Sequence, residues 1–98
     1  MPQFQVYRLP DGMLVVDLQS DLLRTRTRVV APLLPATDDL PPLTRLEPVF
    51  EVDGVRLALH TAELAAIPER LVREAPVADL RDSDDQIRRA LDIVFLGF

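Results

Sequence analysis

The sequence predicts a mainly β fold, a small barrel or antiparallel sheet closed by one C-terminal helix. Apolar and polar residues alternate with a period of about two through much of the chain, as in half-buried strands. The dipeptide Asp53-Gly54 lies between two such segments and is typical of a two-residue hairpin turn. From Ser83 onward the apolar period changes to about 3.6, which indicates an amphipathic helix.

The composition predicts one domain over residues 1–98. With 98 residues, 48% of them hydrophobic, the chain can form one core but not two of ordinary size. Because so short a chain leaves much apolar surface in water, we expect a homodimer. The absence of cysteine excludes disulfides and thiolate metal sites and favours the cytoplasm. We expect neither a signal peptide nor a membrane span, since the longest apolar run, residues 29–34, contains a proline.

The first part of the chain predicts three strands. Residues 4–7 and 14–18 alternate on either side of a turn at residues 9–12, which predicts a β-hairpin. A third strand is expected over residues 28–34, ended by a proline. Residues 36–42 then form a polar, proline-rich loop.

The middle of the chain predicts a second hairpin over residues 46–60, with Asp53-Gly54 as its turn. Thr61 is placed to cap a short helical turn that runs through residues 64–67 and stops at a proline. Residues 72–80 are expected to return to an extended conformation.

The one long helix is expected over residues 83–96. Ser83 and Gln86 have the spacing of a capping box, and Asp84 and Asp85 lie by the positive end of the helix dipole. The face that meets the core is expected to hold Ile87, Ala90, Leu91, Val94 and Phe95.

The chain holds no pattern of catalytic or metal-binding residues. It has one histidine, two serines, three glycines and no phosphate-binding glycine loop. His60 has no second histidine or cysteine to share a metal, so we expect a packed or solvated side chain rather than a base. Asp82, Asp84 and Asp85 are interpreted as stabilising the helix dipole rather than as a cation site. We therefore predict no catalytic residue, no metal and no cofactor.

Three arginines, Arg24, Arg26 and Arg28, alternate with Thr25 and Thr27. In an extended segment their guanidinium groups share one face and are able to grip phosphates or carboxylates. The simpler interpretation, which we favour, is a charged edge that prevents strand addition. A net charge of −5 disfavours broad nucleic-acid binding, so the functional partner that suits these arginines best is an acidic protein.

The chain ends Phe95-Leu96-Gly97-Phe98, with large apolar side chains where chain ends are usually polar. We expect Phe95 to join Leu91 in the core. Leu96 and Phe98 do not both fit that face. Two uses stay open for them, a dimer contact or an anchor for a target protein.

Several segments resemble the CcdB toxins of plasmid-type toxin–antitoxin modules, in the same order along the whole chain. In the first half they are residues 4–7, 14–23 and 29–33. In the second half they are Pro48-Val49-Phe50, Thr61, residues 65–68, residues 77–80 and the helix that ends Phe95-x-Gly97. The resemblance implies a dimeric, SH3-like barrel of the CcdB and MazF type with a C-terminal helix.

The resemblance also implies a function. Such toxins bind the A subunit of DNA gyrase and trap its cleaved-DNA complex, which inhibits this type II topoisomerase. A cognate antitoxin neutralises them when its acidic, disordered tail folds onto the toxin. Toxin and antitoxin together, and not the toxin alone, bind operator DNA and repress transcription of their operon. The protein is therefore predicted to be an inhibitor of an enzyme and not an enzyme itself.

The resemblance further implies binding residues. The family's gyrase-contacting Gln-Ser-Asp-Ile-Ile stretch matches Gln19-Ser20-Asp21-Leu22-Leu23, and its last helical residues match the end of this chain. The predicted gyrase-binding residues are Ser20, Leu22, Leu23, Asp92, Phe95, Leu96, Gly97 and Phe98. The predicted antitoxin-binding residues are Arg8, Asp11, Arg24, Arg26 and Arg28.

The chain departs from the family pattern at the end of the helix. The family ends Trp-Gly-Ile and has an Asn three residues before the Phe, whereas this chain has Leu96-Gly97-Phe98 and Asp92. In the family the Trp stacks on a gyrase arginine, and losing such a cation–π contact costs about 0.5–2 kcal/mol. Two alternatives therefore stay open. One is a MazF-like endoribonuclease that uses the segment Arg24–Arg28, and the other is a homologue that binds antitoxin but has lost gyrase activity.

Overall fold

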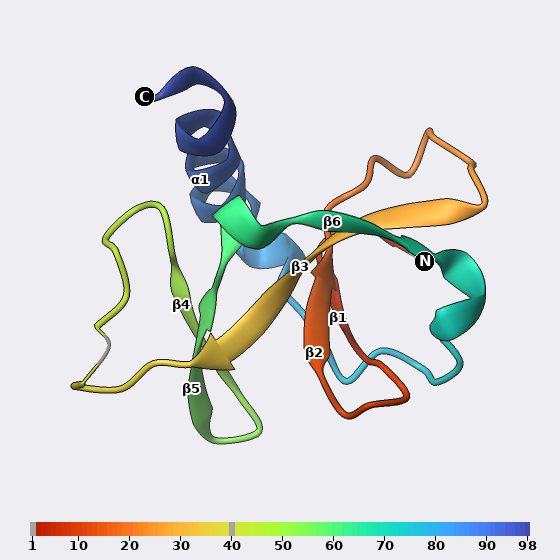
Figure 1. The fold of residues 1–98 in the computed structure, drawn as a ribbon, viewed down its shortest axis with the longest axis horizontal. Coiled ribbons are helices and arrows are strands. Elements are labelled where there is room, and N and C mark those ends of the chain that lie inside the picture. The colour runs from red at the N-terminus through yellow and green to blue at the C-terminus, as the bar shows by residue number, and fades with distance from the viewer. Residues whose placement is uncertain (1, 40) are drawn as a thin grey trace.

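The computed structural model describes residues 2–39 and 41–98, which form a strongly bent antiparallel sheet and one α-helix (Figure 1). The strands are β1 (Gln5–Arg8), β2 (Leu14–Asp17), β3 (Thr27–Pro35), β4 (Val49–Val52), β5 (Val55–Leu59), β6 (Ala65–Pro68) and β7 (Ala78–Asp79). Short 3-10 helices lie at η1 (Thr61–Glu63), η2 (Glu69–Leu71) and η3 (Arg81–Ser83), and the α-helix is α1 (Asp84–Leu96).

Strand β3 organises the sheet because it changes partner along its length. Its first residues, 27–30, pair with β6, and its last residues, 33–35, pair with β5. On its other edge it pairs with β2, which gives the strand order β4-β5-β3-β2-β1-β7 with β6 as a branch. Figure 1 shows β3 crossing the molecule diagonally between the two groups of strands. The result is a nearly closed barrel with one C-terminal helix, as predicted.

The hairpin turn between β4 and β5 has the predicted backbone. Asp53 and Gly54 have φ angles of 52° and 80°, the positive values that a type I′ turn requires. Val52 pairs directly with Val55 across the turn. The Asp-Gly dipeptide therefore sets the register of this hairpin.

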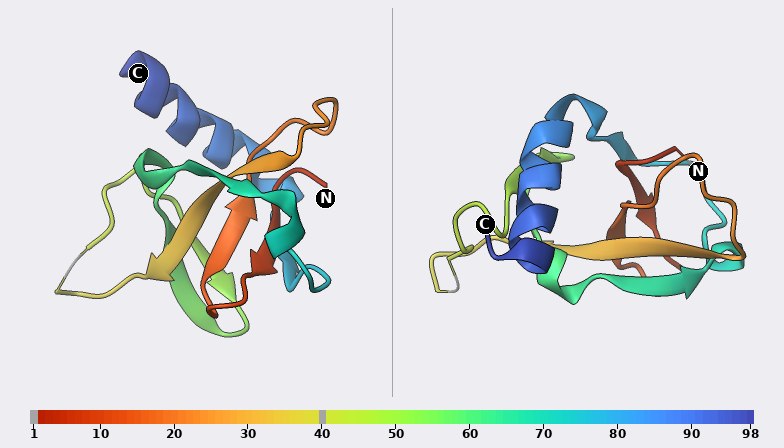
Figure 2. Two further views of the ribbon diagram at one scale, coloured as in Figure 1. Left: turned by 45° about the vertical axis from the view of Figure 1, so that its right-hand side comes forward. Right: turned by 90° about the horizontal axis from the view of Figure 1, so that it is seen from above.

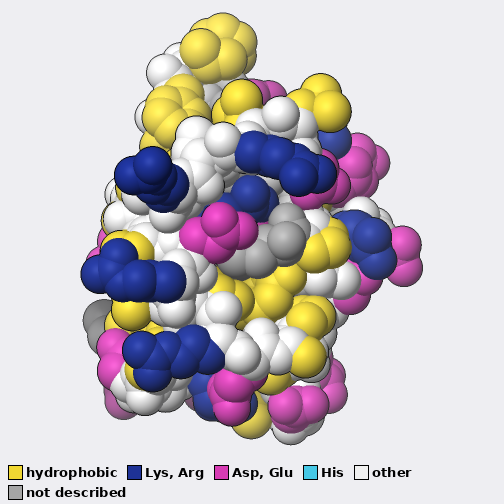
Figure 3. All heavy atoms as spheres, turned by 90° about the vertical axis from the view of Figure 1, so that its right-hand side faces the viewer, with side chains coloured by type: hydrophobic (Ala, Val, Ile, Leu, Met, Phe, Trp, Pro, Cys, Tyr) yellow, Lys and Arg dark blue, Asp and Glu magenta, His cyan; other side chains and the backbone are white. Residues whose placement is uncertain are grey.

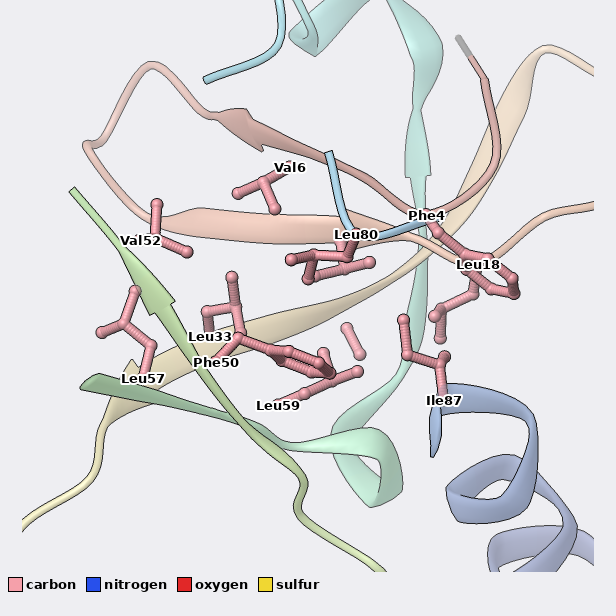
Figure 4. Close-up of a cluster of buried hydrophobic side chains, with 12 residues drawn as sticks. Phe4, Val6, Leu18, Leu33, Phe50, Val52, Leu57, Leu59, Leu80 and Ile87 are labelled. Atoms are coloured by element: carbon pink, nitrogen blue, oxygen red, sulfur yellow. The ribbon is translucent and has the colours of Figure 1, made fainter. Parts of the chain in front are cut away.

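The main core lies inside the barrel, where the side chains point toward one another from β1 to β5 and from α1 (Figure 4). It consists of Phe4, Val6, Val16, Leu18, Ala31, Leu33, Phe50, Val52, Leu57, Leu59, Leu80 and Ile87. Because side chains alternate along a strand, the neighbouring residues Tyr7, Val15 and Val30 form a second, smaller cluster on the other face. Ile67 and Val72 pack against that cluster, so segments 65–72 cover the outer face of the sheet.

The prediction for residues 61–80 was partly wrong. Only residues 61–63 form a helical turn, and Thr61 does not cap it, since its buried hydroxyl donates to the carbonyl of Leu46 at 2.6 Å. Residues 65–68 form β6 instead of continuing the turn, because β3 offers them backbone hydrogen-bond partners that the local sequence does not reveal. Within the range expected to be extended, 72–80, the structure assigns strand only to residues 78–79.

The C-terminal helix forms as predicted, at residues 84–96, but its cap and one side of its apolar face differ. Ser83 makes no side-chain capping bond, because it ends the 3-10 turn η3 that leads into the helix. Ile87 and Ala90 are buried, and Leu91 and Val94 are half-buried. Phe95, expected in the core, is 69% exposed, because only the first part of α1 packs on the barrel while its end projects away (Figure 2).

Ile87 fixes α1 to the core, so Ile87→Ala is expected to lower the free energy of unfolding by about 2–5 kcal/mol. Its side chain is fully buried in the main core, and the alanine leaves a cavity. Urea unfolding measures the change. Arg88→Ala is the control, because this exposed neighbour forms a 3.5 Å ion pair with Asp84 that is worth about 0.5 kcal/mol or less. Equal losses in both variants would contradict the assigned packing of α1.

Candidate functional site

The end of α1 presents apolar side chains to solvent. Phe95, Leu96 and Phe98 are 69%, 62% and 86% exposed. Asp92 lies one turn earlier and is also exposed. Single exposed apolar residues are common, but three within four positions form a patch of the kind that binds a partner.

Gly97 ends the helix in the left-handed conformation, with φ 84° and ψ 1°. Its N–H donates to the carbonyl of Ile93 at 3.0 Å, which satisfies one of the carbonyls left open at the helix end. A residue with a β-carbon is strained at this φ, although the position that a β-carbon would occupy is not crowded by any described residue beyond its neighbours along the chain. Gly97 therefore directs Phe98 away from the helix axis through its backbone conformation.

A second apolar patch lies in the loop between β2 and β3. Leu22 is 92% exposed and Leu23 is 56% exposed. Both lie within a tight turn, in which the Ser20 hydroxyl oxygen accepts from the N–H of Leu22 at 3.1 Å and the Ser20 carbonyl accepts from the N–H of Leu23. The carboxylate of Asp21 accepts from the backbone N–H of Gln3 at 2.7 Å, which ties the loop to the N-terminal segment.

The two patches lie at the same end of the molecule. In Figure 1 and in the left view of Figure 2, the β2–β3 loop and the end of α1 both rise at the top, at separate corners. Residues more than 70 positions apart in the sequence thus face one side. The structure therefore brings the predicted gyrase-binding residues to one end of the barrel, as two patches.

Arg28 does not lie on a charged edge with Arg24 and Arg26, as the sequence alternation had suggested. Residues 24–26 precede β3 and are exposed, whereas Arg28 lies within β3 and is only 5% exposed. Its Nε and Nη2 donate to Oδ2 of the buried Asp17 at 3.0 and 2.7 Å. Burial raises the pKa of the Asp17 carboxyl, and the hydrogen bonds from Arg28 and from the backbone of Gln19 oppose that rise. The main role of Arg28 is thus structural, and its small exposed part lines the pocket that Arg24 also lines.

The other predicted antitoxin-binding residues are exposed. Arg8 ends β1 and donates to the carbonyl of Gly12 at 3.4 Å, and Asp11 accepts from the N–H of Met13 within the same turn. Arg24 lines a pocket of about 570 Å³ between the β2–β3 loop and η2, whose other walls include Arg81 and Glu69. Figure 3 shows the face that includes this pocket, on which arginines lie among acidic side chains.

Arg81, at the edge of this pocket, is paired. Its guanidinium donates to both carboxylate oxygens of Asp79, with the shortest bond at 2.5 Å, and lowers the pKa of that carboxyl to about 2. The pocket therefore has mixed charge rather than uniform positive charge.

His60 is a partly buried side chain with carboxylate neighbours. Its Nδ1 lies 3.2 Å from Oε2 of Glu47 and 2.8 Å from Oε2 of Glu63.

Asp84 and Asp85 lie in the first turn of α1, the position from which the sequence predicts that they stabilise the helix dipole. Among the described residues no group of three or more His, Cys, Asp or Glu is arranged to hold a metal ion. Over the same residues, no helix has the length and apolar character needed to cross a membrane.

Comparison with known proteins supports the fold and identifies the family of the chain. No curated protein sequence matches the chain. Among solved structures, an endoribonuclease from a Mycobacterial species is similar, with a TM-score of 0.76 over 97% of this chain and 90% of that one. Its sequence is only 11% identical, so the likeness concerns the fold. The model of the CcdB protein family matches residues 3–97, almost the whole chain. The chain therefore belongs to the CcdB family, the toxins of toxin–antitoxin modules.

Proposed function

We propose that this protein is a toxin that binds the A subunit of DNA gyrase and traps the cleaved-DNA complex of that enzyme. The observation that carries the proposal is the exposed apolar end of α1, Leu96-Gly97-Phe98, which projects from the barrel and would serve as the anchor. Burying one such side chain completely contributes about 1.5–3 kcal/mol. Two or three of them, with Leu22 at the same end of the molecule, suffice as the central contacts of an interface.

Asp92 supports the same partner. It is exposed one turn before Leu96, on the end of the helix that would meet the target. In the family a tryptophan of the toxin stacks on an arginine of gyrase. Here the carboxylate of Asp92 would attract that arginine, and the aromatic ring of Phe98 would stack on it in place of the tryptophan. This pair of residues supports the proposal that the chain binds the gyrase surface that the family's tryptophan meets.

We further propose that the toxin is a homodimer and that a CcdA-like antitoxin neutralises it and represses the operon with it. The exposed arginines Arg8, Arg24 and Arg26 suit an acidic antitoxin tail. Arg28 is left out of this set, because its guanidinium is buried against Asp17.

The test is a supercoiling and DNA-cleavage assay with gyrase purified from the source organism. We expect the protein to inhibit supercoiling and to leave cleaved DNA when the reaction is stopped with detergent, because it holds gyrase in its cleaved complex. Unchanged supercoiling together with tight antitoxin binding would identify a homologue that has lost gyrase activity, and would overturn the proposal.

The endoribonuclease alternative is tested in the same preparation. An endoribonuclease shares this fold, and the segment Arg24–Arg28 is the candidate site for such an activity here. Two observations favour gyrase instead. Arg28 is bound to Asp17, and the Thr25 hydroxyl already donates to the carbonyl of Thr27 at 2.6 Å. Cleavage of RNA by the protein without gyrase, lost in Arg24→Ala, would support the alternative.

Gly97 gives a sharper prediction. Gly97→Val is expected to weaken gyrase binding about tenfold, because a β-branched residue resists a positive φ and Phe98 is then directed elsewhere. The melting temperature is expected to fall only slightly, because the strain lies at the exposed end of the helix, where no core contact depends on it. Gly97→Asn is the matched control, because asparagine tolerates this conformation. Calorimetric titration measures the affinities. Unfolding of Gly97→Val would show instead that the tail is structural.

A further inference from the structure

Gln19 is a polar residue that the structure buries, with 6% of its surface exposed. It lies just after β2, at the start of the loop that carries Leu22 and Leu23. Its position matches the first residue of the stretch that contacts gyrase in the family, yet it has almost no surface to offer a partner. Its side chain must be accounted for within the molecule.

The two ends of the Gln19 amide bond to different parts of the chain. Its Oε1 accepts from the backbone N–H of Val29 in β3 at 3.1 Å. Its Nε2 donates to the carbonyl of Leu23 at 3.1 Å and to the hydroxyl of Thr25 at 3.3 Å, both in the loop. The side chain is thus a bridge between the barrel and the loop.

The backbone of Gln19 is held as well. Its N–H donates to Oδ1 of Asp17 at 3.0 Å, and its carbonyl accepts from Nη2 of Arg28 at 3.5 Å. The buried ion pair therefore fixes the base from which the Gln19 side chain reaches the loop. Residues 21–26 themselves are exposed and lie outside the strands, so they contribute no packed core of their own.

We infer that Gln19 is a positioning residue, which presents Leu22 and Leu23 to the partner without touching it. This inference rests on the proposed function. A loop that is already ordered loses less conformational entropy on binding, so its leucines bind more tightly than those of a mobile loop. Gln19 holds Leu23 through the carbonyl of that residue. Leu22 is fixed on both sides, because its own N–H bonds to Ser20 and the next residue bonds to Gln19.

The test uses Gln19→Glu, which keeps the shape of the side chain. A carboxylate oxygen is still able to accept from Val29, but the atom that replaces Nε2 is an acceptor facing the carbonyl of Leu23. The bond to the Leu23 carbonyl is lost, and a bond to Thr25 survives only where its hydroxyl turns away from the Thr27 carbonyl to donate to the new oxygen. Because only 6% of the surface of Gln19 is exposed, the new charge also lowers the stability of the whole chain. Gln86→Glu is the matched control, since it makes the same change at an exposed position in the first turns of α1. Should Gln19→Glu fail to fold, Thr25→Val removes one of the loop's acceptors from an exposed position.

Two measurements are made on the full chain. Amide hydrogen exchange of residues 20–26 reports the order of the loop without gyrase. Titration with the A subunit of gyrase reports the affinity of four chains. These are the unmodified chain, Gln19→Glu, Leu22→Ala and the double variant. We expect the largest increase in exchange in the loop, an affinity about tenfold lower, and a Leu22→Ala effect that is several-fold smaller in the Gln19→Glu background.

The outcomes separate this inference from the proposed function. Unchanged loop exchange in Gln19→Glu overturns the positioning role, whether or not gyrase binds. Faster exchange with full gyrase affinity overturns it too, because the order of the loop then has no bearing on the partner. Failure of the unmodified chain to bind gyrase overturns the proposed function, and with it the partner named here, while the exchange result still decides whether Gln19 orders the loop.

Discussion

A chain lacking Leu96, Gly97 and Phe98 is expected to bind gyrase at least about 100-fold more weakly than the full chain while staying folded. Leu96 and Phe98 are 62% and 86% exposed, so the barrel loses little packing when they are removed. Burial against a partner would contribute about 1.5–3 kcal/mol for each, and their combined loss exceeds two factors of ten. The core contacts of α1, made by Ile87 and Ala90, remain.

Isothermal titration with the A subunit of gyrase and thermal unfolding measure the two parts of this prediction. Val55→Ala is the matched control, since Val55 is a half-exposed apolar residue at the start of β5 and belongs to neither patch. Full affinity in the truncated chain would show that the tail is no anchor. A truncated chain that becomes monomeric would assign the tail to the dimer contact, the other use left open by the sequence.

Arg28→Met is expected to lower the free energy of unfolding by about 3–5 kcal/mol at pH 7. Asp17 has no exposed surface, and Arg28 is its ion-pair partner at 2.7 Å. Methionine fills similar space but offers no donor, so the carboxylate is left buried without its cation. The double variant Asp17→Asn, Arg28→Met is expected to be more stable than Arg28→Met alone, because asparagine is neutral and leaves no unpaired charge in the interior. Denaturant unfolding measures all three chains.

The pH dependence of Arg28→Met has a definite sign. Burial already raises the pKa of Asp17 above its usual 3.8, and Arg28 opposes the rise. Without Arg28 the folded-state pKa rises further. An acid whose pKa is higher in the folded than in the unfolded state destabilises the fold as pH rises through that folded value. The deficit of Arg28→Met is therefore expected to shrink as pH falls from about 7 toward about 4. A deficit that is constant over this range would show that the ionised carboxylate is not its cause.

Much of the fold follows from local chemistry that the sequence displays. Asp53-Gly54 requires only its own backbone preference to form a tight turn, and the helical period after Ser83 repeats within a few turns. Gly97 likewise ends α1 in the left-handed conformation that its missing side chain permits. The resemblance to the CcdB family, which the family model supports over residues 3–97, also depends on the order of residues alone.

Other features depend on partners that are distant in the sequence. Residues 65–68 are a strand because β3 lies beside them, and Arg28 is buried because Asp17 on β2 receives it. Phe95 is exposed because α1 leaves the barrel before its last turn. The apolar period of a helix predicts which face is buried, but not how far along the helix the burial extends. The sequence alone thus determined the fold class, the main turn, the helix and the two candidate patches. The tertiary structure decided which polar side chains are buried and that both patches face one end, because burial depends on which neighbours the rest of the chain supplies.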